Sequence, residues 1–401
     1  MRILTLKKNI HLVIFTIAGL STILRPSIES KITLFRVLLP FLVLLLLIIN
    51  KRKFINFFIL SSTFVLYAII VSYISVFQTV NTPFILYYVT LFFLFFYSSA
   101  VFKKYDKIEI FSYFKGLYIC LLVLGFTQYF FGGVYFNTQD RLPAINIFFW
   151  NENDYSAVLT LLTCFYFIVV NNKLKYILLF CSLFLIVHND AKMAVIALML
   201  FFLGSIMLKI KLSRKLKLGF MGFVLIAAIT AYFLKDYRIQ GGYSISTIVE
   251  NLVERIYTQE ILLHLGSFNS RSNAIILGVG NFFNSFGLGI GPGNSILMMT
   301  EIVIPGTERW AAKSMHNFIF QIITEAGVFG ITLLLAIYFK IRKIIKRNTD
   351  YSKGVLIVYF LSIIITITIL SGGAWSNYFF FLVLFFSIEF FNQKNHDFKT
   401  R

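Results

Sequence analysis

Long apolar runs separated by short polar segments make up most of this chain. A helix that crosses the hydrocarbon core of a bilayer needs about 20 mostly apolar residues, and most of the runs approach that length. The sequence therefore predicts an all-α polytopic membrane protein with about twelve transmembrane helices and one large helical extracytoplasmic loop. The predicted helices are residues 9–24, 32–49, 54–77, 83–102, 109–131, 155–170, 174–188, 191–208, 216–234, 316–339, 354–370 and 374–391.

These helices divide the chain into four regions. Residues 1–134 hold the first five helices, residues 135–234 hold helices six to nine with a short external loop, and residues 316–401 hold the last three. Residues 235–315 form the large loop. Apolar residues recur there at helical spacing around 245–256, which predicts an amphipathic helix, and a second helical stretch at about 270–285 ends in a glycine-rich turn.

Composition and charge agree with a membrane protein. The 401 residues are 58% hydrophobic and only 13% charged, yet the formal net charge is +20. In a soluble protein such a charge suggests nucleic acid, but 25 of the 37 Lys and Arg residues fall in alternate loops, as the positive-inside rule requires. The charge thus predicts topology, with both termini cytoplasmic and no nucleic-acid partner.

His316 is the first candidate for chemistry, because it lies where the tenth predicted helix meets the outer interface. Histidine exchanges protons near neutral pH. Asn317 follows it, and Glu325 lies nine residues into the same predicted helix, about 13.5 Å deeper and on the opposite face of a regular helix. We interpret Glu325 as a structural group that pairs inside the bundle, with Arg36 and Lys115 as the only cations within helices. Gly327 is interpreted as a helix-packing position.

Cations on the outer side are scarce, so each is informative. Four of them are candidates for holding a diphosphate, since guanidinium and ammonium groups suit phosphate oxygens. They are Arg141, Lys192, Arg271 and Arg309. The alternative for each is a cation that contacts lipid headgroups. No histidine or cysteine cluster has metal-ligand spacing, so no metal and no cofactor is expected.

The block around His316 resembles a known family. His316-Asn317 and the following Glu325-Ala326-Gly327-Val328-Phe329-Gly330 are similar to a block of the O-antigen ligase and O-antigen polymerase superfamily. Ser270-Arg271 and the turn Gly289-Ile290-Gly291-Pro292-Gly293-Asn294 precede it in the order that this family shows.

Two earlier segments resemble the same family with departures. Arg141 followed by Asn151-Glu152-Asn153 is similar to its R…N-P-N block, with Glu152 in place of proline. Lys192, in Asp190-Ala191-Lys192, stands where the family usually has arginine. The motifs cover roughly residues 135–335.

The resemblance implies a metal-independent, inverting glycosyltransferase with a lipid-linked glycan donor, usually on undecaprenyl diphosphate. It implies a site on the outer face of a bacterial cytoplasmic membrane, with His316 as base and the four cations around the diphosphate. We expect a polymerase that joins repeat units of capsule, O-antigen or exopolysaccharide. Its partners would be donor, glycan acceptor and membrane lipids, with a flippase and a chain-length regulator as further candidates.

Two alternatives stay open. A ligase that moves finished glycan to another acceptor carries the same motifs. A lipid-linked glycan flippase or transporter is the alternative from another class. Transporters tend to show repeated halves and broken helices with polar residues near the bilayer centre, and the sequence shows no repeat.

Overall fold

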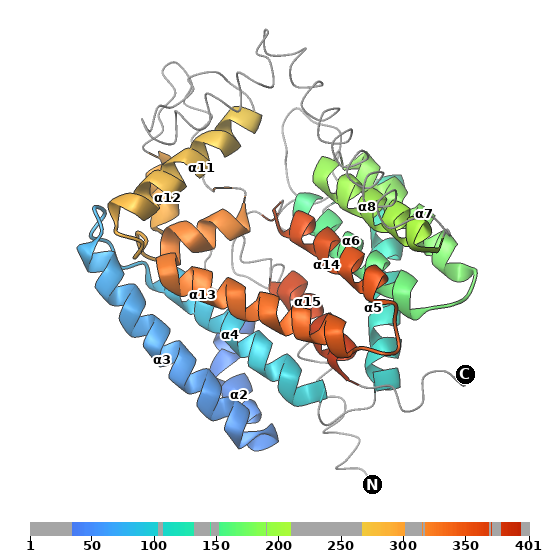
Figure 1. Cartoon of the computed structure of the whole chain (residues 1–401), viewed down its shortest axis with the longest axis horizontal. Coiled ribbons are helices and arrows are strands. Elements are labelled where there is room, and N and C mark those ends of the chain that lie inside the picture. The colour runs from blue at the N-terminus through green and yellow to red at the C-terminus, as the bar shows by residue number, and fades with distance from the viewer. Residues whose placement is uncertain are drawn as a thin grey trace.

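A computed structural model gives the arrangement of the chain (Figure 1). It describes residues 34–102, 107–131, 145, 152–189, 191–209, 267–300, 315, 317–368, 370 and 378–393. These residues form twelve α-helices and no strand. The helices are α2 (Leu34–Ile49), α3 (Lys51–Ile74), α4 (Thr82–Phe102), α5 (Lys107–Phe131), α6 (Glu152–Val169), α7 (Leu174–His188), α8 (Lys192–Lys209), α11 (Ser267–Asn284), α12 (Asn294–Thr300), α13 (Phe318–Arg347), α14 (Lys353–Ile367) and α15 (Tyr378–Asn392).

The predicted all-α class is confirmed for the described residues. The predicted helices at 9–24 and 216–234 and the amphipathic helix around 245–256 lie outside those residues, while each other predicted helix coincides with one in the structure. Four helices are long and apolar enough to cross a membrane: α3, α4, α5 and α13. They suggest a multi-pass membrane protein. The helices α6, α7, α8, α14 and α15 are apolar but shorter.

The centre of the bundle is formed by α4 and α15 (Figure 1). Apolar side chains surround α15 on all sides, which is typical of a helix enclosed by other helices. It packs against α4 on one side and α6 on another, and α3 covers α4 further out. A second group, in which α14 pairs with α8 and α6 with α7, completes the bundle.

Basic side chains gather at one end of α4. The Lys53 ammonium from the start of α3 lies 6.0 Å from the Phe96 ring, and the Lys340 ammonium of α13 lies 4.4 Å from the Phe95 ring. Helix α13 extends to Arg347, beyond its predicted end at residue 339, so several predicted loop cations lie on a helix. This basic end matches the side that the charge pattern assigns to the cytoplasm.

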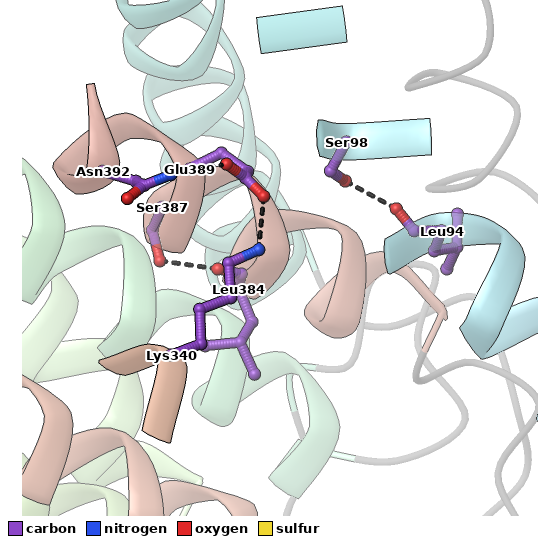
Figure 2. A network of polar contacts seen from close by, with 7 residues as sticks. All are labelled: Leu94, Ser98, Lys340, Leu384, Ser387, Glu389 and Asn392. Carbon is purple, nitrogen blue, oxygen red and sulfur yellow. Dashed lines mark hydrogen bonds and ion pairs between the residues drawn. The ribbon is translucent and has the colours of Figure 1, made fainter. Parts of the chain in front are cut away.

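An ion pair joins α13 to α15 at this end. Figure 2 shows the Lys340 ammonium donating to the Glu389 carboxyl, with the Asn392 side chain 3.4 Å from the other carboxyl oxygen. The Glu389 side chain is 7% exposed and that of Lys340 23%. Removing one partner of such a pair leaves a buried charge uncompensated, whereas removing both does not.

We expect Lys340→Met to lower the free energy of unfolding by about 3 kcal/mol, because Glu389 loses its counter-charge. The double variant Lys340→Met/Glu389→Gln should recover most of this loss. Thermal unfolding of the purified protein in detergent measures both, with Lys343→Met, an exposed neighbour on α13, as control. A double variant no more stable than Lys340→Met would contradict the role of the pair.

Candidate functional site

The structure describes the predicted site residues to different extents. His316, Arg141 and Arg309 lie outside the described residues. For Lys192, which begins α8, and Arg271, near the start of α11, the backbone alone is described. The side chains of Asn317 and Glu325 are described in full, as is the backbone conformation of Gly327.

Asn317 caps the N-terminus of α13. Its backbone is extended, with φ −151° and ψ 101°, and its side-chain oxygen accepts from the backbone N–H of Phe320 at 3.3 Å. Asparagine is among the preferred N-cap residues for this reason. Helix α13 therefore begins at Phe318 and not at residue 316. A regular helix from His316 to Glu325 would place the two side chains on opposite faces and at a fixed difference in depth. This expectation does not apply, because Asn317 between them is not helical.

Helix α13 is broken at Gly327. This residue has φ 50° and ψ −133°, a conformation that favours glycine. A Cβ on Gly330 would lie 2.6 Å from the carbonyl oxygen of Ile322, so the segment before the break folds close to the segment after it. A Cβ on Gly327 would also lie under 3.0 Å from backbone atoms of Gly287 and Leu288, so this glycine does permit close packing, but it does not lie in a regular helix. Its conformation, and not only its small size, creates the site's shape.

The glycine-rich turn between α11 and α12 supplies the hydrogen bonds that the break leaves open. The N–H groups of Ile290 and Gly291 donate to the carbonyl oxygens of Thr324 and Glu325 at 2.9 and 3.0 Å. The N–H of Val328 donates to Gly287 at 2.8 Å. Buried backbone groups need such partners, and the turn provides them across a sequence separation of more than thirty residues.

Alternate glycines allow the turn to approach so closely. Gly287, Gly289, Gly291 and Gly293 all have positive φ. A Cβ on Gly289 would lie 2.7 Å from the backbone nitrogen of Gly327, which leaves no room for a side chain. The turn is also held from α3, since the Tyr67 hydroxyl lies 2.5 Å from the Leu288 carbonyl oxygen and 3.0 Å from that of Ala326.

The Glu325 carboxyl lies beside this turn, fully buried. Ser295 of α12 and the Gln321 side chain of α13 donate to one carboxyl oxygen, the latter at 2.8 Å, and the Tyr88 hydroxyl of α4 donates to the other at 2.8 Å. These hydrogen bonds join three helices at one point. The expected pairing inside the bundle is therefore present, but the partners are neutral. Lys115 lies on α5, which packs against α6 and α7 and contributes none of them.

A second group of contacts joins Ile145 to the end of α7 and to α6. The Asn189 side chain, at the end of α7, accepts from the N–H of Ile145 at 2.9 Å and donates to its carbonyl oxygen at 2.8 Å. It also donates to the Ser156 hydroxyl of α6 at 3.1 Å. Ile145 follows Arg141 by four residues and Asn189 precedes Lys192 by three. Asn189 thus holds Ile145 between the end of α7 and the start of α6.

We expect Asn189→Ala to lower the free energy of unfolding by about 3 kcal/mol, since the N–H and carbonyl of buried Ile145 lose their partners. Asn171→Ala, an exposed asparagine before α7, is the matched control and should leave stability unchanged. Thermal unfolding of both purified variants measures the difference. Equal melting temperatures for the two variants would show that Asn189 does not hold the Ile145 segment.

Sequence reasoning missed three features of the site. They are Asn189, Ser295 and Tyr88, none of which belongs to a motif in the sequence. Helical periodicity did not predict the break in α13 either, and broken helices are typical of transporters. A glycine two residues after a carboxylate in an apolar helix was the available signal for the break.

Helices α11 and α12 lie beside the start of α13 at one end of the structure (Figure 1), and the glycine-rich turn fixes them there. This arrangement brings the Ser270-Arg271 helix, the turn and the Glu325–Gly330 block together. Comparison with known proteins adds no assignment, because no family model matches the chain and no curated protein matches it significantly.

Proposed function

We propose that the chain is a membrane glycosyltransferase that polymerises lipid-linked oligosaccharide repeat units into capsule, O-antigen or exopolysaccharide. The donor in this proposal is linked to undecaprenyl diphosphate and the acceptor is another growing glycan. The site faces the outer side of a bacterial cytoplasmic membrane, with twelve spans and both termini in the cytoplasm. A flippase and a chain-length regulator are the expected partners.

One observation carries this proposal. Three sequence blocks that resemble the O-antigen polymerase and ligase superfamily are separated along the chain but meet in the structure. Backbone hydrogen bonds join the Gly289–Asn294 turn to the Glu325–Gly330 block, and α11, which bears Arg271, packs on α13. This end of the bundle lies away from the basic end formed by Lys53 and Lys340.

The proposed chemistry is a single displacement at the anomeric carbon of the donor. The acceptor hydroxyl oxygen forms the new bond to that carbon while the bond from the carbon to the diphosphate oxygen breaks. His316 accepts the hydroxyl proton, and the lipid diphosphate leaves with the electron pair. Arg141, Lys192, Arg271 and Arg309 stabilise its negative charge, which is the role of preorganised cations around a leaving phosphate.

A specific observation also favours a second candidate, a transporter of lipid-linked glycan. Discontinuous helices with buried polar groups are typical of transporters, and α13 has both a break at Gly327 and the buried Glu325 beside it. The twofold repeat common among transporters is not evident in the sequence. A ligase is the remaining alternative within the same chemistry.

Purified protein in liposomes, supplied with lipid-linked repeat units alone, separates these functions. A polymerase extends the glycan without any second acceptor, giving a ladder of products that differ by one repeat unit. A ligase yields product only after a separate acceptor is added. Intact donor that moves between leaflets without a change in glycan length would contradict both transferases.

A further inference from the structure

The negative charge of Glu325 has no positive partner among its described contacts. Its side chain is fully buried, and the groups that donate to it, from Ser295, Gln321 and Tyr88, are uncharged. The backbone of Gly293 donates a further hydrogen bond to this carboxyl, and this donor is uncharged as well. A carboxylate enclosed in an apolar bundle normally pairs with a positive charge, and none is present among the described contacts of Glu325.

Two carboxamide oxygens near this carboxyl also lack partners. The Gln321 nitrogen donates to Glu325 and the Asn294 nitrogen donates to the carbonyl oxygens of Ile290 and Thr79, at 2.7 and 3.1 Å. These bonds fix both amide orientations, because exchanging N and O would place oxygen against oxygen. The Gln321 and Asn294 oxygens are therefore left buried without a donor among the described residues.

A hydroxyl from α3 approaches the same place. Ser72 is fully buried, and its hydroxyl has no hydrogen-bond partner among the described residues. A Cβ on Gly291 would lie under 3.0 Å from this hydroxyl oxygen and 3.1 Å from the Asn294 side-chain nitrogen. The N–H of Gly291 itself donates to the Glu325 carbonyl oxygen. Oxygens from α3, α12 and α13 thus collect around one turn.

We propose that this cluster of Glu325, Gln321, Asn294 and Ser72 binds a sodium ion. Carboxylate, amide and hydroxyl oxygens are ligands for hard cations. The Gln321, Asn294 and Ser72 oxygens lack donors among the described residues and are available for such an ion, and Glu325 beside them supplies the negative charge. One carboxylate balances one positive charge, which favours a monovalent over a divalent cation. Helices broken within a membrane are a common place for such ions. The site stands independently of the proposed glycosyl transfer.

The test compares the thermal unfolding of purified protein in detergent with sodium chloride or N-methyl-D-glucamine chloride, at equal ionic strength and one pH. A ligand that binds only the folded state raises the melting temperature with the logarithm of its concentration above the dissociation constant, here by roughly 2–4 °C at about ten times that constant. Glu325→Gln should remove this sodium response. Glu389→Gln is the matched control, since it changes another buried carboxyl of the described residues and should keep the response.

Gln321→Met provides a second variant should Glu325→Gln fail to fold. It keeps the side-chain length and removes one proposed ligand oxygen, so the same rise in melting temperature should need at least ten times more sodium. Equal melting temperatures of the wild-type protein in the two salts would overturn the site. A melting temperature that changes with pH but not with sodium would overturn the sodium site as well, and would indicate that Glu325 binds a proton instead.

Discussion

Gly327→Ala should prevent the chain from reaching its folded state. The φ of +50° at this position is strained for any residue with a Cβ, and that Cβ would lie under 3.0 Å from backbone atoms of Gly287 and Leu288. Backbone cannot move aside as a flexible side chain can. We expect the free energy of unfolding to fall by about 4 kcal/mol or more, which is exceptional for one methyl group.

Size-exclusion chromatography of the solubilised protein measures this effect through the loss of a monodisperse peak. The matched control is Gly116→Ala on α5, because a Cβ there meets nothing within 4 Å. Since alanine is the better helix former, this control should be as stable as the wild type or slightly more stable. A Gly327→Ala protein that elutes and melts like the control would show that α13 can continue as a regular helix.

His316→Ala should abolish polymer formation while the protein still inserts and folds. In the proposed mechanism this histidine takes the proton from the attacking sugar hydroxyl, and a positioned base contributes about 10²–10⁴-fold to a rate. We expect the elongation rate on lipid-linked repeat units to fall by that factor, with little change in melting temperature. The readout is product length on gels after incubation with purified protein.

His264→Ala is the control for this variant. His264 lies in the large predicted loop that precedes His316 but outside the motifs that resemble the polymerase family, so its replacement should leave elongation unchanged. A His316→Ala protein that produces glycans of normal length would reject His316 as the base, whatever the identity of the overall reaction.

The helices could be predicted because the apolar runs are long and their ends carry charge. The structure places α7 at Leu174–His188, the predicted bounds, and the other described helices begin and end within a few residues of theirs, except α12, which corresponds to no predicted helix. The main exception is α13, whose basic last turns continue to Arg347. The last turns of α13 carry lysine and arginine side chains, so a prediction from apolar residues alone places the end of this helix too early.

The shape of the site could not be predicted from periodicity. Counting turns from His316 to Glu325 assumes one regular helix, and two local features remove that assumption: the Asn317 cap and the Gly327 break. Both depend on contacts with distant segments, the break above all on the turn that contains Gly289. The same turn brings Ser295 to Glu325, a contact between residues thirty positions apart.

The product that accompanies each new glycosidic bond tests the central claim most directly. Glycosyl transfer from a lipid diphosphate donor requires one lipid diphosphate to be released for each bond formed. We predict that purified protein in liposomes releases one lipid diphosphate for each repeat unit that it joins, and that His316→Ala releases none. Donor that crosses the bilayer intact, with no lipid diphosphate released, would contradict the account and favour a transporter.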